Sequence, residues 1–330
     1  MTILVVEDFV TNASIMRTSL AKIGHDVKTA RDGAEALQFL QQQSFDMVIT
    51  DWLMPKMDGF ELIQNIVKIG NSRPLLVMVS SLGSAEAQEK VLDAGADAYL
   101  AKPVTPEQMQ SVVTDLERQR SHKVSSSSIR NIKVQRPLTS HFDGVALVAG
   151  TGGATALRSI LKQFTRSDNA AYFVVLHGPG WATAALTEKM KMELDLDLVL
   201  PGKEERLRPG VVYVAPGDKH LVVSDGGSSV HLSDTPPENY LRPSADPLLR
   251  SLAATFGKRA IAVVLGGTSC DAAIGCGYVK VAEGTVVVQK TSGSVASQMP
   301  QNVIDLGLAD QVMSLEDIPG WVKRHLMKHA

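Results

Sequence analysis

The chain has 330 residues, 44% of them hydrophobic, and a formal net charge of −2. This length is enough for two domains, and the charge provides no basic surface of the kind that nucleic-acid binding requires. No apolar run reaches the length of a membrane span, and a strand-like run, not a signal peptide, opens the sequence. The two cysteines, Cys270 and Cys276, have the spacing of neither a disulfide framework nor a zinc site, so we expect a cytoplasmic protein.

The first 120 residues alternate short apolar runs with amphipathic stretches. This alternation predicts five βα units, and therefore an α/β domain whose parallel sheet has helices on both faces. The strands are expected at Ile3–Val6, Asp26–Thr29, Met47–Thr50, Leu75–Val79 and Ala98–Leu100. The helices are expected at Asn12–Lys22, Ala34–Gln42, Phe60–Lys68, Ala85–Ala94 and Pro106–Glu117.

Polar and charged residues follow four of these predicted strands. Glu7 and Asp8 come after the first strand and Asp51 after the third, while Ser80 and Lys102 come after the fourth and fifth. Because the carboxyl ends of parallel strands meet at one edge of a sheet, we expect these side chains to lie together. Three carboxylates repel one another unless a cation intervenes, and such a set suits Mg²⁺. The hydroxyl and the ammonium group could hold a phosphoryl group.

This constellation resembles the two-component receiver domain. The resemblance implies a flavodoxin-like (βα)5 fold in which Asp51 accepts a phosphoryl group from a histidine kinase. It also implies that Glu7, Asp8 and the backbone carbonyl of Leu53 help Asp51 to hold Mg²⁺.

The same resemblance implies a switch that responds to phosphorylation. Ser80 and Lys102 would contact the phosphoryl oxygens and shift, and Tyr99 occupies the position of a rotating aromatic residue. We therefore expect phosphorylation to act on whatever the receiver contacts in the rest of the chain.

Residues 121–140 interrupt the α/β pattern. They are serine-rich at first and then basic, with Pro137 near the end. We interpret them as a linker between a receiver domain at residues 1–120 and an output domain at residues 141–330. Packing of this segment into a groove between the domains is the alternative.

A second α/β pattern begins near Gly144 and predicts a doubly wound parallel sheet. Val211–Ala215 and His220–Ser224, joined through Pro216-Gly217-Asp218, are predicted to form a β-hairpin, which His231–Leu232 extends. The other strands are expected at Val145–Val148, Phe173–Leu176, Ala260–Leu265 and Thr285–Gln289.

The turn after Val145–Val148 has the pattern of a catalytic elbow. An apolar strand enters a glycine-rich turn, and a helix begins near Ala154; hydrolases place a serine at such a turn, but here the residue is Gly150. His177 and Asp271 follow two other strands of the same predicted sheet. A nucleophile–His–Asp triad could assemble at these strand ends, with its nucleophile missing.

Residues 144–330 resemble the catalytic domain of the chemotaxis receptor methylesterase family, CheB. The resemblance rests on Thr151–Gly153, His177 with Pro179, Leu207–Asp218, Arg242–Asp246 and Met299-Pro300. It implies that Gly150, beside Thr151, occupies the nucleophile position, that His177 is the general base and that Asp271 orients it. The resemblance also implies a loop that helps to stabilise the oxyanion, with a methionine flanked by glycines before the aspartate and a glycine after it. Here that loop contains Thr268, Ser269 and Cys270 before Asp271 and Ala272 after it, so it departs from the family pattern.

These features predict a response regulator whose methylesterase-like output has lost hydrolysis and acts by binding a chemoreceptor or another signalling protein. The alternative is an active protein-glutamate methylesterase, or another ester hydrolase, whose nucleophile is Thr151, Ser269, Cys270 or a water activated by His177. A nucleotide site at Gly150–Gly153 is a weak hypothesis, because the third glycine of the usual fingerprint would fall at Thr155. A DNA-binding output is weaker, because no basic recognition helix is present.

Overall fold

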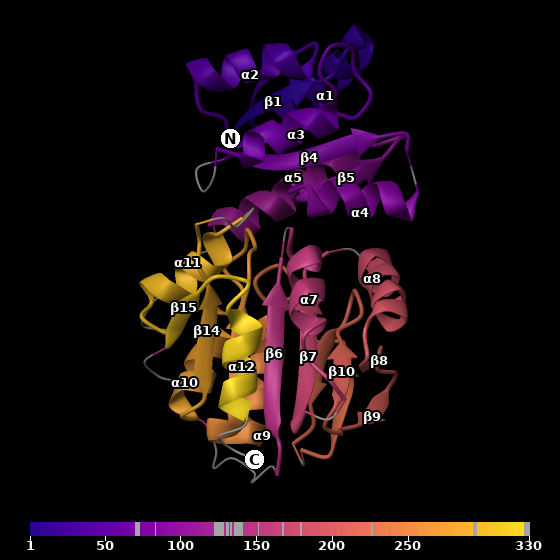
Figure 1. The fold of residues 1–330 in the computed structure, drawn as a ribbon. Helices are drawn as coiled ribbons and strands as arrows, with labels where there is room; N and C mark the ends of the chain where they lie inside the picture. Colours follow the sequence, from indigo (N-terminus) through magenta and orange to yellow (C-terminus); the bar gives the residue numbers. More distant parts are fainter. Residues whose placement is uncertain are drawn as a thin grey trace. The chain divides into compact units, whose positions relative to one another are not determined.

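The computed structural model divides the chain into two compact units, Met1–Arg120 and Ser121–Ala330 (Figure 1). Among the described residues, no helix is both long and apolar enough to cross a membrane. The structure describes residues 1–69, 73–82, 84–121, 129, 132, 134, 141–150, 152–166, 168–178, 180–225, 227–292 and 296–326.

The first unit contains a five-stranded parallel sheet in the order β2-β1-β3-β4-β5. This arrangement confirms the predicted (βα)5 domain, and most element bounds lie within two residues of those expected. The strands are β1 Thr2–Val6, β2 Asp26–Ala30, β3 Met47–Asp51, β4 Leu75–Ser80 and β5 Ala98–Ala101. The helices are α1 Val10–Lys22, α2 Gly33–Gln42, α3 Gly59–Val67, α4 Ala85–Asp93 and α5 Pro106–Ser121.

Two layers of helices cover this sheet because successive strand residues point to opposite faces. Leu4 of β1 packs in the core shared with Ile63 of α3, on the face that α2 and α4 also cover. Ile3 packs on the other face with Leu20 of α1 and Val113 of α5. The sheet is therefore buried on both sides, and only the strand ends and loops are left to form a site.

The second unit contains a seven-stranded parallel sheet in the order β15-β14-β13-β6-β7-β10-β8. The first strand of this sheet in the sequence, β6, lies between β7 and β13, so the strand order reverses beside it. Such a reversal opens a crevice at the carboxyl ends of the strands. The bounds are β6 Asp143–Ala149, β7 Ala170–Leu176, β8 Asp197–Val199, β10 Val211–Val214, β13 Ala260–Val264, β14 Thr285–Gln289 and β15 Gln311–Met313.

Helices cover both faces of this second sheet, which confirms the doubly wound prediction. Apolar residues of α7 Gly153–Leu161, α8 Gly180–Glu193 and α12 Ile318–Leu326 form one core with the sheet. Those of α9 Ala245–Phe256, α10 Ala273–Val281 and α11 Gln298–Asp305 form the other. A short 3-10 turn, Gly257–Arg259, connects α9 to β13.

The predicted pairing of Val211–Ala215 with His220–Ser224 is wrong. β10 is an inner strand of the parallel sheet, paired with β7 and β8. All four of its residues are buried, as expected of a strand covered on both faces. Because β7 and β8 occupy both hydrogen-bonding edges of β10, no edge is left for a partner strand from the following segment.

The antiparallel hairpin of this unit lies one strand later. β11 His220–Val223 pairs with β12 Ser229–Ser233, and β12 pairs with β9 Glu204–Arg206, giving a three-stranded sheet. Ser224 holds the turn, since its hydroxyl lies 2.8 Å from the carbonyl oxygen of Ser229 and 2.7 Å from the hydroxyl of Ser229. The loop after β10 therefore connects two sheets.

Three described residues of the predicted linker belong to the second unit and pack against other parts of it. Ile129 and Val134 pack against its core. Ile132 lies beside α10, where a methyl group added to Gly277 would be 2.8 Å from its Cδ1 atom. The remainder of residues 121–140, apart from the backbone of Ser121, lies outside the described residues, so the extent of the linker stays a prediction.

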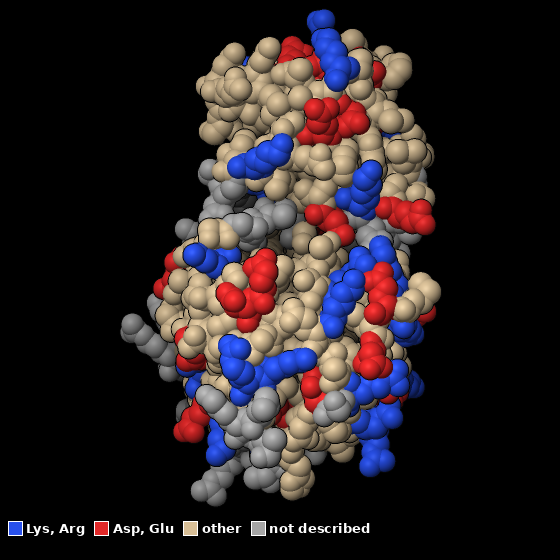
Figure 2. Space-filling model, viewed as in Figure 1, with Lys and Arg blue, Asp and Glu red and all other residues tan. Residues whose placement is uncertain are grey.

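Charged side chains of both signs are interspersed on the face drawn in Figure 2. Neither unit presents an extended field of a single sign on that face. This face therefore shows no single-sign patch of the kind that steers a charged partner over a distance.

Candidate functional site

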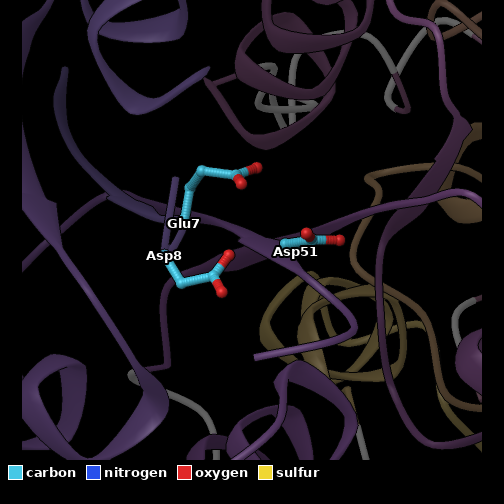
Figure 3. A group of neighbouring side chains, drawn as sticks. All are labelled: Glu7, Asp8 and Asp51. Atoms are coloured by element: carbon cyan, nitrogen blue, oxygen red, sulfur yellow. The ribbon is translucent and has the colours of Figure 1, made fainter. Parts of the chain in front are cut away.

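Three carboxylates meet at the carboxyl edge of the first sheet. Glu7 and Asp8 follow β1, and Asp51 ends the neighbouring strand β3 (Figure 3). One oxygen atom of each residue lies within 4.8 Å of those of the other two. Glu7, Asp8 and Asp51 therefore lie together, as we expected from the sequence.

Lys102 joins two of these carboxylates. Its Nζ atom lies 2.8 Å from Asp51 Oδ2 and 3.0 Å from Glu7 Oε2. Burial opposes the charge of Lys102, but the bonds to Asp51 and Glu7 outweigh that effect and raise the pKa of this lysine. The backbone N–H of Trp52 donates to the other oxygen, Asp51 Oδ1, at 2.7 Å. Both oxygens of Asp51 are thus held in defined positions.

The cluster has the composition of a divalent cation site. Asp8 Oδ1 is buried and has no hydrogen-bond partner within the described part of the chain. Three carboxylates outnumber the single ammonium group of Lys102, which leaves the cluster negative. Hard oxygen ligands with excess negative charge suit an ion such as Mg²⁺, and the unsatisfied oxygen of Asp8 gives such an ion a ligand. The residues present therefore fit the metal that the sequence predicted.

The remaining receiver residues surround this edge. Ser80 ends β4 and is buried, and its Oγ atom accepts the N–H of Leu82 at 3.1 Å. The Tyr99 hydroxyl donates to the carbonyl oxygen of Leu82, so two of the three predicted switch residues, Ser80 and Tyr99, contact this loop residue. Leu53 lies two residues after Asp51 with an exposed side chain, and the metal-binding role of its carbonyl stays a prediction.

Sequence reasoning missed one polar neighbour of the acidic cluster. The Asn12 amide, in the first turn of α1, donates to Glu7 Oε1 at 3.2 Å. The sequence did contain a signal for this contact. Asn12 is a polar residue five positions after Glu7, at the start of the helix that follows it. Asn12 therefore helps to orient Glu7.

The second constellation lies at the carboxyl edge of the second sheet. Gly150 follows β6, His177 follows β7 and Asp271 lies in the loop after β13. Backbone hydrogen bonds fix two of these positions, since Gly150 donates to Gly266 at 2.8 Å and His177 donates to Ala149 at 2.9 Å. The three strand ends expected to meet therefore lie at the switch point of the sheet.

His177 and Asp271 form a buried pair with a 2.7 Å separation between His177 Nε2 and Asp271 Oδ2. Burial opposes ionisation of Asp271, but the bond to His177 and those from Ala245 and Ser244 outweigh it and lower the pKa of Asp271 to about 2. An ionised carboxylate only accepts hydrogen bonds, so Nε2 of His177 must carry a proton. In the neutral ring, Nδ1 is then free to accept.

The free nitrogen of His177 faces the position where a nucleophile would lie. A methyl group added to Gly150 would be 3.3 Å from His177 Nδ1, but only 2.8 Å from the Cα atom of Gly267. The second distance is too short for any side chain unless the backbone moves. The His177–Asp271 pair therefore faces Gly150, and the backbone of the β13–α10 loop lies close to the position that the resemblance assigns to a nucleophile.

The other proposed nucleophiles are unfavourably placed or outside the described residues. Ser269 and Cys270 are both buried. Ser269 Oγ accepts the N–H of Asp271 at 3.3 Å and lies 3.8 Å from the sulfur of Met299. Thr151 lies outside the described residues, as does Pro179.

Three residues around Asp271 were not assigned a role from the sequence. Ser244 Oγ donates to Asp271 Oδ1 at 2.6 Å, and the Asn239 amide contacts both Asp271 and Asp246. Ser244 and Asp246 lie in the Arg242–Asp246 segment, which matched the family pattern. That match was the signal in the sequence that Ser244 and Asp246 lie near the site. It did not predict their contacts with Asp271 and Asn239, which come from other segments.

The fold and the two strand-end sites define a response regulator, in which a receiver unit precedes an α/β output unit. Residues 3–114 match the response regulator receiver domain, and residues 145–322 match the CheB methylesterase family. The chain belongs to the CheB methylesterase family.

Relatives and one solved structure agree with this assignment. A protein-glutamate methylesterase/protein-glutamine glutaminase of Nocardioides sp. is 32% identical over 99% of this chain and 95% of its own length. A relative of the same description in Nitratidesulfovibrio vulgaris is 31% identical, with 92% of each chain covered. The CheB methylesterase catalytic domain of Thermotoga maritima, at 30% identity, covers 56% of this chain and 98% of its own, with a TM-score of 0.54.

Proposed function

We propose that this response regulator is phosphorylated on Asp51 by a histidine kinase. The support is the contact of Asp51 with Lys102 and its position beside Glu7 and Asp8. In this proposal the three carboxylates and the carbonyl of Leu53 hold Mg²⁺, which offsets negative charge on the phosphoryl group when it is bound. Lys102 exchanges its carboxylate contacts for phosphoryl oxygens, with Ser80 beside it, and Tyr99 follows the loop at Leu82.

The output unit, in our proposal, no longer hydrolyses esters. The observation that carries this conclusion is the approach of Gly267 to the Gly150 position, which has no hydroxyl and no room for one without backbone movement. Removing the serine of a Ser–His–Asp triad lowers turnover by about six orders of magnitude. The altered Thr268–Ala272 loop reduces what remains, because that segment normally helps to stabilise the oxyanion.

The output unit would then act by binding. We propose a chemoreceptor or another signalling protein as the partner, because the curated relatives bear the description protein-glutamate methylesterase/protein-glutamine glutaminase. We place this signalling in the cytoplasm, in keeping with two buried cysteines that form no disulfide within the described residues.

A second candidate is an active methylesterase or glutaminase with an unconventional nucleophile. The intact His177–Asp271 pair favours it, since a general base is still present. Thr151 or a water molecule would have to supply the nucleophile, because Ser269 and Cys270 are buried.

Methanol release from methylated receptor glutamates separates the two candidates. The full chain, with and without phosphorylation, is compared with its His177→Ala variant. We expect all samples to release methanol at the background rate. Turnover by the native chain that disappears in His177→Ala would contradict the loss of hydrolysis, and a further loss in Thr151→Ala would identify the nucleophile.

A further inference from the structure

A second buried carboxylate lies behind the His177–Asp271 pair. Asp246, in the first turn of α9, is completely buried, and so is Asp271. The Nδ2 atom of Asn239 lies 2.8 Å from Asp246 Oδ2 and 2.9 Å from Asp271 Oδ1. A side-chain amide nitrogen carries two hydrogens, so Asn239 donates one to each carboxyl group.

Two adjacent buried carboxyl groups cannot both be charged without a large penalty. Asp271 is the ionised member, since it has donors from His177, Ser244 and Ala245. Asp246 has the backbone N–H of Gly275 at 2.7 Å, and no ion pair links it to a cation within the described residues. Its burial and the charge of Asp271 raise the pKa of Asp246 to about 8. The ionisable groups around it are Asp271, His177, Glu238, Arg250, Cys276 and His220.

We propose that Asn239 and Asp246 are positioning residues for the His177–Asp271 pair. Asp246 is present as the neutral acid, so that the Asn239 amide binds two carboxyl groups of which only Asp271 is charged. Nothing in this inference depends on whether the output unit hydrolyses esters, because it concerns only how the imidazole is held.

The backbone supports this role for Asn239. Its φ of 54° lies in the left-handed region, which raises the energy of most residues but is tolerated by asparagine. Asn239 and Ser244 together hold Asp271 Oδ1, so that Oδ2 is directed to His177 and the N–H of Ala245. The amide therefore fixes the carboxylate, the carboxylate fixes the proton on Nε2, and Nδ1 is left facing Gly150.

The ring nitrogens of His177 provide the readout, because ¹⁵N NMR distinguishes the two tautomers. The full chain has eight histidines, and a His177→Gln variant assigns the signal. We expect the Nε2–H form to dominate in the native chain. Asn239→Gly removes the amide and the left-handed strain together, while Asn239→Asp keeps the shape but replaces the donor with an acceptor. Both should shift the ring toward a mixture of tautomers.

The matched control is Asn169→Gly, which removes an exposed amide that donates to the His141 carbonyl at 3.3 Å. It should leave the His177 signals unchanged. Native tautomer populations in both Asn239 variants would overturn the proposal. Failure of both variants to fold would also contradict it, because Asn239 would then hold the fold and not the ring.

A pH titration tests the role of Asp246. Ionisation of Asp246 places a second charge beside Asp271, so the His177 ring signals of the native chain should show an inflection near pH 8. Asp246→Asn should abolish that inflection, whereas Asp234→Asn, which changes an exposed carboxylate paired with Lys219, should retain it. An inflection that persists in Asp246→Asn, or none in the native chain, would refute the neutral-acid assignment.

Discussion

The receiver edge and the output edge of this chain use the same structural principle with different outcomes. In both, parallel strands end side by side and present polar residues from separate segments. At the receiver edge, Lys102 bonds to Asp51 and Glu7 with ordinary distances. At the output edge, His177 and Asp271 are hydrogen-bonded, but Gly267 Cα lies 2.8 Å from the place of a Cβ atom added to Gly150. The same strand-end arrangement therefore holds a connected polar cluster at one edge, and at the other a polar pair beside a position closed off by backbone.

Asp51→Ala tests the receiver edge, and its expected effect, the complete loss of phosphorylation, is the largest of these predictions. A small-molecule phosphodonor with Mg²⁺ should add one phosphoryl group to the native chain, and the variant should take up none. The reason is that Asp51 is the carboxylate held by both Lys102 and the Trp52 N–H. Intact-protein mass spectrometry measures the transfer.

Asp26→Ala is the matched control for this prediction. It removes an exposed aspartate at the start of β2, and it should leave phosphorylation intact. Chelation of Mg²⁺ should stop the transfer to the native chain. Labelling that persists in Asp51→Ala would show that the phosphoacceptor is a different residue.

Gly150→Ser tests whether the output edge can simply be repaired. The new Cβ atom would lie 2.8 Å from the Gly267 Cα atom, so we expect no methanol release and a loss of about 1–3 kcal/mol in the free energy of unfolding from overpacking. Calorimetry of the output unit measures the stability change.

Gly202→Ser gives the comparison for that variant, since nothing lies within 4 Å of a methyl group added there. It should change stability by less than about 0.5 kcal/mol. Full esterase activity in Gly150→Ser would show that the Gly267 backbone moves aside easily, and the closure of the site would then not be what prevents hydrolysis.

Ala272→Gly probes the altered loop and has the smallest expected effect. Ala272 has a φ of 69°, so the loop keeps a left-handed residue where the resemblance expects glycine. A left-handed alanine costs about 1–2 kcal/mol, and the change to glycine removes that cost. The change also loses a buried methyl group and makes the unfolded chain more flexible, and both of these effects lower stability. Ala215→Gly removes a buried alanine whose φ is not in that region. Ala272→Gly should therefore be less destabilising than Ala215→Gly by about 1–2 kcal/mol; equal losses would show that no strain is stored at Ala272.

The fold of the first unit followed from the sequence more completely than that of the second. Its strands and helices alternate regularly, so each periodic segment corresponds to one element. In the second unit, β10 and β11 are both short apolar runs, and their spacing suggested a hairpin. Only the pairing of β10 with β7 and β8, and of β11 with β12, assigns the two strands to different sheets.

The residues of the two sites were predictable to different depths. Strand-end position was enough to bring Glu7, Asp8 and Asp51 together, because adjacent parallel strands must end near one another. Asn239 was not predictable, since it comes from an irregular segment with a left-handed backbone and has no periodic pattern.

The sequence by itself determined the receiver and CheB family patterns, the strand-end residues and the absence of a side chain at Gly150. These are local properties, because composition, hydrophobic period and residue type can be read along the chain. The tertiary structure alone decided that Gly267 occupies the space beside Gly150 and that Asn239 joins Asp246 to Asp271. Both are distances between segments far apart in sequence, and such distances are set by how the sheet, loops and helices pack together.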